Sequence, residues 1–161
     1  LALGPGANFV GKRWPPARFA ELVSRLRATG GPVAGLRIVL FGAPDEAAIT
    51  REIRDSLQAA GAPVLDLAGR LDLLASAAAL ERAALFVGND SGLMHVAAAL
   101  GKPMAAIYGS SDPKHTPPLS PQARVIYLGL DCSPCFERQC PLGHTRCLND
   151  IQPEQVLQVL S

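Results

Sequence analysis

Neither an excess of charge nor an abundance of aromatic residues marks this sequence. Its 15 basic and 14 acidic residues leave a net charge of +1, and aromatic residues make up 5% of the chain. Nucleic-acid-binding domains usually carry a basic face and a pI above about 9, and single-strand binders stack bases on aromatic side chains. We therefore expect no nucleic-acid partner.

Long hydrophobic runs are also missing. No stretch approaches the roughly 18 apolar residues of a membrane-spanning helix, and no basic leader followed by an apolar run marks a secretory signal. We therefore expect a cytoplasmic protein. The first residue is Leu1 rather than Met, from which we expect the chain to begin inside a longer protein.

Several catalytic motifs are absent as well. The sequence has no Gly-x-x-x-x-Gly-Lys-[Ser/Thr] loop, which disfavours a P-loop NTPase, and no Gly-x-Ser-x-Gly elbow, which disfavours a serine hydrolase. A short-chain sugar-nucleotide epimerase would carry a Tyr-x-x-x-Lys pair, but neither Tyr108 nor Tyr127 is followed by lysine four residues later.

What the sequence does contain is a regular alternation of apolar runs and helical patterns. Its 161 residues, 48% of them hydrophobic, fit one domain with its own core. Short apolar runs, typical of strands buried on both faces, cover residues 1–3, 37–41, 64–67, 85–87, 104–108 and 124–128. Helices are expected from Pro15-Pro16 to Gly30-Gly31 and over 46–59, 73–83, 92–100 and 153–160. This order predicts an α/β fold, a three-layer Rossmann-like parallel sheet with helices on both faces.

Ligands of such sheets bind beyond the carboxyl ends of the strands, and the loop after 85–87 carries the strongest signal there. Ser91, Gly92 and Leu93 begin the helix that follows, so their backbone N–H groups and the helix dipole are suited to a diphosphate. His95 lies one helical turn after Ser91, on the same face. The simpler alternative is that Asp90 or Ser91 caps the helix and His95 is an ordinary residue.

Residues 88–103 resemble the signature of the heptosyltransferase family. The family's Asp-[Ser/Thr]-Gly-x-x-His element, which holds the nucleotide-sugar donor, is matched by Asp90, Ser91, Gly92 and His95. Residues 4–7 with 12–15, and residues 40–43, are similar to other family segments. Residues 108–113 with 116–119 look like a loop of the enzymes that add the second heptose. The similarity follows the family order along essentially the whole chain.

This resemblance implies the C-terminal, donor-binding domain of a glycosyltransferase B fold. The donor would be ADP-heptose, and heptose would pass to the inner core of lipopolysaccharide without a cofactor for the transfer. The acceptor and the catalytic base would belong to an N-terminal domain that this chain lacks, so we expect no catalytic residue here and an inactive fragment. Peripheral contact with the inner membrane would be compatible with such an acceptor. The alternative is a nucleotide-sugar-binding module of another two-domain glycosyltransferase with a different donor.

Two further residues complete the expected donor site, which comprises Lys12, Glu46, Asp90, Ser91, Gly92, Leu93 and His95. Lys12 follows the first strand, where a fixed cation would stabilise charge on the departing diphosphate; the alternative is a solvated surface lysine. Glu46, like Asp45, follows the second strand, where an acid can bind ribose hydroxyls, or can simply favour the start of a helix. The family match implies that Asp90 accepts hydrogen bonds from the donor sugar.

Four cysteines interrupt the alternating pattern within an irregular segment, residues 131–148, called here the cysteine-rich segment. Their spacing is Cys132-x2-Cys135-x4-Cys140-x6-Cys147. Clustered thiolates in a cytosolic protein suggest structural zinc, bound by all four cysteines or by three together with His144. Free thiols, disulfides formed on oxidation, and an iron–sulfur cluster are the alternatives. A zinc site is expected to be closed and to lie away from the donor cleft.

Overall fold

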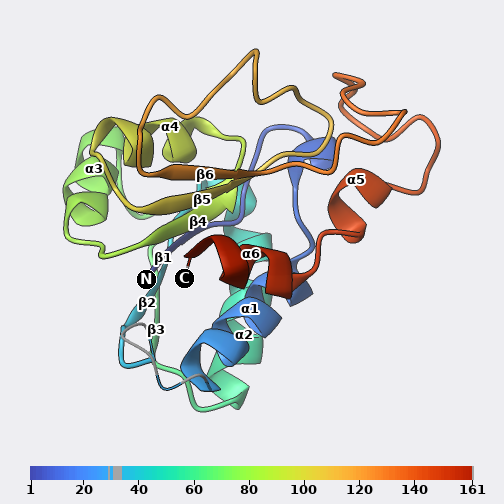
Figure 1. Ribbon diagram of the computed structural model, residues 1–161. Coiled ribbons are helices and arrows are strands. Elements are labelled where there is room, and N and C mark those ends of the chain that lie inside the picture. Colours follow the sequence, from blue (N-terminus) through green and yellow to red (C-terminus); the bar gives the residue numbers. More distant parts are fainter. Residues whose placement is uncertain (29, 31–33, 161) are drawn as a thin grey trace.

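The chain forms a six-stranded parallel sheet in a computed structural model that describes residues 1–28, 30 and 34–160 (Figure 1). The strand order is β3-β2-β1-β4-β5-β6, and every neighbouring pair is parallel. The predicted Rossmann-like sheet is therefore confirmed. Its strands are β1 (Ala2–Gly4), β2 (Ile38–Leu40), β3 (Val64–Asp66), β4 (Phe86–Asn89), β5 (Met104–Ile107) and β6 (Ala123–Ile126).

Helices follow the strands as predicted, with small shifts at their ends. They are α1 (Pro16–Ala28), α2 (Ala47–Ala59), α3 (Leu73–Glu81), α4 (Gly92–Ala99) and α6 (Pro153–Leu160). Gly31, one of the two glycines expected to end the first helix, lies outside the described residues. The pattern did not predict three short elements, which are η1 (Val10–Lys12), η2 (Pro44–Glu46) and α5 (Arg146–Asn149). One to two turns bury too few residues to create a periodic signal.

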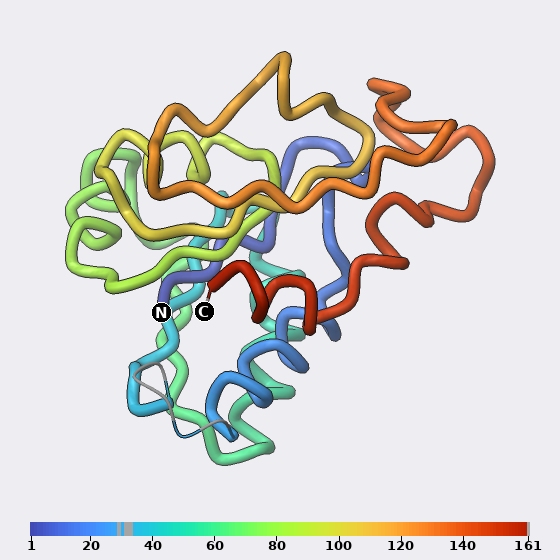
Figure 2. The backbone as a smooth tube through the Cα atoms, in the orientation of Figure 1, coloured from blue at the N-terminus to red at the C-terminus, as the bar shows by residue number. Residues whose placement is uncertain are grey.

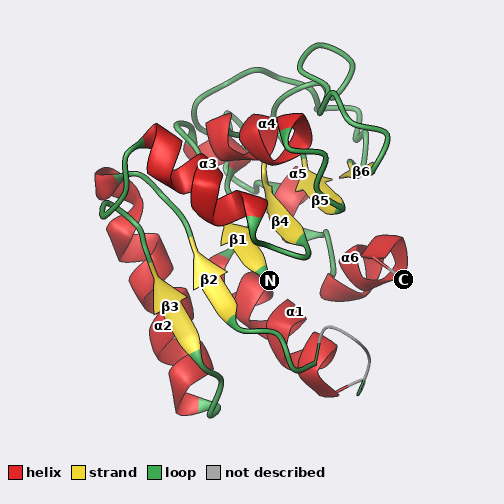
Figure 3. Ribbon diagram, turned by 90° about the vertical axis from the view of Figure 1, so that its left-hand side faces the viewer, coloured by secondary structure: helices red, strands yellow, loops and turns green. Residues whose placement is uncertain are grey.

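The helices form two layers on opposite faces of the sheet (Figure 3). Helices α1, α2 and α6 pack on one face, and α3 and α4 pack on the other. Side chains alternate along each strand: Ala105 and Ile107 of β5 enter the first core, while Met104 and Ala106 enter the second. Both faces of the central strands are thus covered, which explains why these strands read as continuous apolar runs.

The sheet reverses its direction of growth between β1 and β4. From β1 the chain adds β2 and β3 on one side, and from β4 it adds β5 and β6 on the other. Loops after β1 and β4 therefore diverge and leave a crevice, the usual ligand position in such sheets. The strands end close together here, since a Cβ added to Gly88 would lie 2.9 Å from the carbonyl oxygen of Gly4.

Asn89, at the end of β4, fixes the loop that follows β1. Its side chain is fully buried; its Oδ1 accepts a hydrogen bond from the backbone N–H of Trp14 at 3.1 Å, and its Nδ2 donates to the carbonyl oxygen of Pro5 at 2.7 Å. One amide therefore satisfies both ends of this loop. Within residues 1–28, 30 and 34–160, no helix is both long and apolar enough to cross a membrane.

Replacement of Asn89 by alanine should destabilise the fold. The Trp14 N–H and the Pro5 carbonyl would lose their buried partner, and each unpaired group costs about 1–3 kcal/mol, so the free energy of unfolding should fall by about 2–4 kcal/mol. Urea denaturation measures the change. Asn149→Ala, which removes an exposed amide donor, is the control, with an expected change within about 0.5 kcal/mol. Equal effects of the two substitutions would contradict the view that the buried hydrogen bonds of Asn89 stabilise the loop after β1.

Candidate functional site

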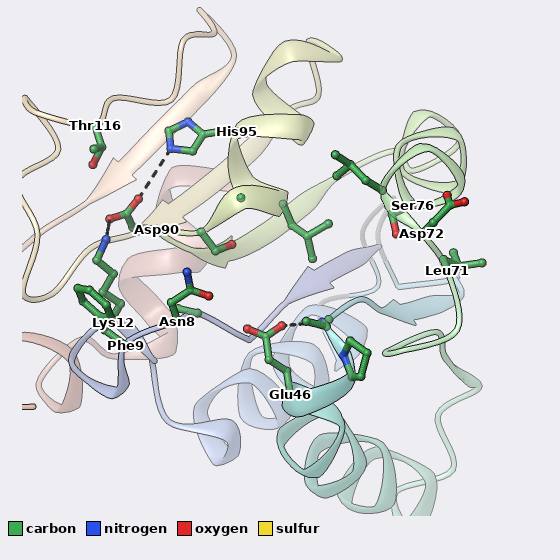
Figure 4. A pocket seen from close by; sticks show the side chains of 18 residues that line it. Asn8, Phe9, Lys12, Glu46, Leu71, Asp72, Ser76, Asp90, His95 and Thr116 are labelled. Carbon is green, nitrogen blue, oxygen red and sulfur yellow. Dashed lines mark hydrogen bonds and ion pairs between the residues drawn. The ribbon is translucent and has the colours of Figure 1, made fainter. Parts of the chain in front are cut away.

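A cleft of about 530 Å³ opens at the reversal point between β1 and β4 (Figure 4). Its walls come from the loops after β1, β2, β4 and β5 and from the start of α3 with the residues just before it. The cleft brings together all seven residues predicted to bind a donor: Lys12, Glu46, Asp90, Ser91, Gly92, Leu93 and His95. Sequence reasoning did not single out five other polar or aromatic residues of its lining, which are Asn8, Phe9, Asp72, Ser76 and Thr116.

Asp90 forms the centre of the charged end of the cleft. Its side chain is 4% exposed, and its Oδ2 accepts hydrogen bonds from Lys12 Nζ at 2.7 Å and from Ser111 Oγ at 2.6 Å. His95 Nε2 lies 4.0 Å from Oδ1, and Figure 4 shows Asp90 between Lys12 and His95. Because Oδ2 already has two donors, Oδ1 is the oxygen better placed to accept a hydrogen bond from a ligand.

Lys12 is not a freely solvated surface lysine. Its side chain is 22% exposed, its Nζ is paired with Asp90, and the ammonium lies 5.5 Å from the centre of the Phe9 ring. The 3-10 turn η1 carries it to this position. An ammonium group has three N–H donors, so Lys12 presents a fixed cation with donors left for an anionic ligand in the cleft.

The start of α4 is uncapped, contrary to the simpler alternative for Asp90 and Ser91. Ser91 occupies the N-cap position in extended conformation, but its side chain makes no capping hydrogen bond. Among the described residues, its buried Oγ has no hydrogen-bond partner. A Cβ added to Gly92 would meet no atom within 4 Å. The first turn of α4 therefore faces open space with its N–H groups, an arrangement suited to an anion.

Glu46 lies away from Asp90, between it and the side of the cleft formed by Leu71 and Asp72 (Figure 4). Its buried carboxylate accepts a hydrogen bond from the backbone N–H of Ala43 at 2.8 Å, and a Cβ added to Gly6 would overlap it at 2.0–2.2 Å. Glu46 therefore joins η2 to the loop after β1. This structural contact leaves its expected role toward a ribose as a prediction. Asp45, the other acid considered there, is exposed and does not line the cleft.

Tyr108 is a buried group beside this site to which the sequence analysis gave no role of its own. Its Oη donates to the carbonyl oxygen of Thr116 at 2.5 Å, which links the end of β5 to the loop at the cleft. Burial raises the pKa of the Tyr108 phenol, and the negative charge of Asp90 raises it further. The phenol therefore stays a neutral donor. Trp14 anchors the end of the loop after β1 in the core, because its indole is fully buried and donates to the carbonyl oxygen of Ile151.

The four cysteines are unpaired and line a second cavity, of about 20 Å³, together with His144. The backbone N–H of Thr145 donates to the Cys140 sulfur at 3.4 Å and, with those of residues 142–144, lowers the pKa of this thiol. Burial raises the pKa of Cys147, and so do the charges of the other three cysteines, which indicates their proximity. Among the described residues, no group of three or more His, Cys, Asp or Glu side chains is arranged as it stands to hold a metal ion.

The sequence predicted that the cysteine site would lie away from the donor cleft. The cavity instead lies close to the cleft. Gly11 lines the cysteine cavity and Lys12 lines the cleft, so the turn η1 separates the two. Figure 2 shows the cysteine-rich segment beside the blue tube of η1. Spacing along the sequence could not show this contact, because more than 120 positions separate Gly11 from its hydrogen-bond partner Arg138.

The sequence matches the model of glycosyltransferase family 9 (heptosyltransferase) over residues 1–146. The chain belongs to this family. Lipopolysaccharide heptosyltransferase 2 of Escherichia coli (strain K12) is 39% identical over 159 residues, or 98% of this family 9 chain and 44% of that protein. The resemblance inferred from the Asp-Ser-Gly-x-x-His element is confirmed.

Solved structures agree with the family assignment. The structure of E. coli ADP-heptose lps heptosyltransferase II is 36% identical, with a TM-score of 0.79 over 99% of this chain and 44% of that chain. The E. coli heptosyltransferase WaaC with ADP-2-deoxy-2-fluoro heptose has the same fold, with 23% identity and a TM-score of 0.69 over 99% of this chain and 43% of that chain. The family 9 chain thus spans less than half the length of these relatives.

The raised pKa of Tyr108 predicts a loss of stability in alkaline solution. Below pH 10 the phenol is neutral in both the folded and the unfolded chain. Above pH 10, the ordinary value, only the unfolded chain ionises, so this group lowers the free energy of unfolding by up to about 1.4 kcal/mol per pH unit.

Urea denaturation between pH 8 and pH 11 would test this. The stability difference between the natural chain and Tyr108→Phe should be constant below pH 10 and should shift above it, in favour of the variant. Tyr127→Phe retains the Tyr108 phenol and should keep the alkaline loss. A difference independent of pH throughout would refute the role given to Tyr108.

Proposed function

We propose that this chain is the donor-binding domain of an enzyme that transfers heptose from ADP-heptose to the inner core of lipopolysaccharide. The observation that carries the proposal is the cleft at the reversal point, where a fixed Lys12 and the uncapped start of α4 face the same space. The names of the relatives support the choice of reaction and donor. The proposal assigns the acceptor and the catalytic base to a domain outside this chain.

The diphosphate of the donor would bind at the charged end of the cleft. The first N–H groups of α4 and its dipole favour an anion, and the buried Ser91 Oγ beside them has no partner among the described residues. Lys12 would lie beside the leaving diphosphate. Negative charge grows on this group as the bond to the sugar breaks, so a fixed cation there stabilises the transition state.

The remaining predicted residues would position the two ends of the donor. Asp90 Oδ1 and His95 lie together at the charged end, where they would bind hydroxyls of the sugar. Glu46 lies toward the other end, where its carboxylate would accept hydrogen bonds from the ribose, in addition to its contact with Ala43. Leu93 would contribute its backbone N–H group to the phosphates.

The proposed transfer of heptose requires no cofactor. Structural zinc, which the cysteine spacing suggested, is a separate proposal for the cysteine-rich segment. A nucleotide-sugar donor would place the reaction in the cytoplasm, and an acceptor carried by a lipid would bring the enzyme to the inner membrane as a peripheral partner. A donor with another base would fit the same cleft chemistry, and the nucleotide comparison below tests that alternative.

ADP affinity should depend on Lys12. Lys12→Ala removes the cation and leaves Asp90 without its main partner, so we expect ADP to bind at least about tenfold more weakly, or about 1.4 kcal/mol. Lys12→Arg keeps a cation and should retain part of the affinity. Isothermal titration calorimetry measures the change. The control is Lys114→Ala, an exposed lysine outside the cleft, and titration with UDP and GDP tests the choice of base.

One outcome would reject this site, and another would keep the site but change the donor. ADP affinity that is unchanged in both Lys12→Ala and Asp90→Ala, with both variants folded by circular dichroism, would exclude the charged end of the cleft. Tighter binding of UDP or GDP than of ADP would retain the cleft and replace the donor.

The 161-residue chain alone should bind ADP without transferring heptose. The proposal gives it the donor cleft but neither the acceptor site nor the base. Radiolabelled ADP-heptose and a heptose-deficient core acceptor provide the assay, and the protein with its acceptor domain is the positive control. Transfer by the chain alone at the rate of that control would contradict this division of roles.

A further inference from the structure

The cysteine-rich segment gathers soft ligands around one small space. Its 20 Å³ cavity is lined by every cysteine of the chain. This volume is about that needed for a single water-sized sphere. The four cysteines are spread along an irregular segment, and the fold places all of them around the same cavity.

Two polar groups indicate that the cavity is suited to a charged thiolate centre: one unpartnered hydroxyl and one thiol that already accepts a hydrogen bond. Ser110 is 2% exposed, lines the cavity, and carries an Oγ with no hydrogen-bond partner among the described residues. Cys140 accepts a backbone hydrogen bond from Thr145. Sulfurs of metal-thiolate sites are stabilised by such outer N–H and hydroxyl donors. A cavity in an apolar core would have neither feature.

We propose that this cavity is a structural zinc site, in which one Zn²⁺ is bound by Cys132, Cys135, Cys140 and Cys147. Four thiolates satisfy the tetrahedral preference of zinc, with Zn–S distances of about 2.3 Å. Rotation of the cysteine side chains is required, because their present arrangement does not meet the geometry of a bound ion. His144 is left out of the ligand set, since its Nδ1 already accepts a hydrogen bond from the backbone N–H of Arg146 at 3.1 Å.

The composition of the segment supplies the reason for a metal. Phe136 and Leu142 are 56% and 62% exposed, so of the large apolar side chains of the segment only Leu148, its last residue, is buried. Metal binding contributes folding energy directly in such segments. Disulfides would order it too, but the four thiols are unpaired and share one cavity rather than lying in two separate pairs.

The position of the cavity gives the zinc a second effect, which rests on the proposed donor site. The backbone of Arg138 accepts a hydrogen bond from Gly11 at 3.0 Å, and the Phe136 N–H donates to the carbonyl oxygen of Ser110 at 2.7 Å. The guanidinium of Arg138 lies 5.0 Å from the centre of the Phe9 ring, which in turn lies beside Lys12. Zinc would therefore hold the segment that supports the Lys12 turn.

Metal content tests the site itself. Chain purified without added metal should contain about one zinc per molecule by mass spectrometry of the elements. His144→Ala should retain it, and Cys140→Ser should lose most of it. Reduced, metal-free natural chain should also bind one Co²⁺ and develop the visible absorption of tetrahedral cobalt–thiolate, a readout that needs no variant to fold.

Three results would overturn the zinc assignment. They are zinc far below one per chain with no cobalt–thiolate absorption, stoichiometric iron in place of zinc, and disulfides found by mass spectrometry in chain that was never oxidised. Equal loss of zinc in His144→Ala and Cys140→Ser would overturn the ligand set.

The effect on the donor site is tested separately, by titration of ADP into the zinc-loaded and the metal-free chain. We expect the metal-free chain to bind ADP several-fold more weakly and to regain affinity when zinc is restored. Equal affinities would refute the coupling while leaving the metal site intact. No ADP binding by either form would instead count against the proposed donor function, because metal content is measured independently of it.

Discussion

The buried carboxylate of Asp90 brings three loops of the chain to one point. A charge removed from water must be paired and hydrogen-bonded, since an isolated buried carboxylate is very costly. Lys12 supplies the counter-charge from the loop after β1, and Ser111 supplies a hydroxyl from the loop after β5. Asp90 itself follows β4. One compensated charge therefore fixes the relative positions of the loops that form the cleft.

Neutral hydrogen bonds extend this arrangement away from Asp90. Asn89 precedes it and satisfies both ends of the loop that carries Lys12. Tyr108 fixes the loop that carries Ser111 by donating a hydrogen bond to the carbonyl oxygen of Thr116. These groups are buried at the carboxyl ends of β4 and β5. The sheet thus supplies a rigid base on which the irregular loops are held by side chains rather than by their own secondary structure.

Local sequence patterns predicted the sheet and its layers. A different argument predicted which residues line the cleft. Apolar alternation and capping signals depend on near neighbours, so strands such as Met104–Ile107 could be recognised directly. Lys12 was predicted to lie at the cleft because it follows a strand at the ligand-binding edge of the sheet, and His95 because it lies one helical turn after Ser91 in the family element; both line the cleft. The contacts of Ser111 and Asn89 were missed, since their partners lie 21 and 84 positions away along the chain. The contact of the cysteine-rich segment with η1 was missed for the same reason.

Pairing with Asp90 also changes what Lys12 can do for a diphosphate. A lysine already compensated by a carboxylate attracts an incoming anion less strongly than a free one would. Its ammonium group is, however, fixed before the ligand arrives, so it needs no reorganisation when charge develops. The start of α4 adds positive potential with no side-chain cap to offset it. Such a cleft therefore depends less on the net electrostatic attraction of the diphosphate than on the fixed positions of its positive groups. Fixed positive groups can stabilise the charge of the transition state more than that of the bound donor.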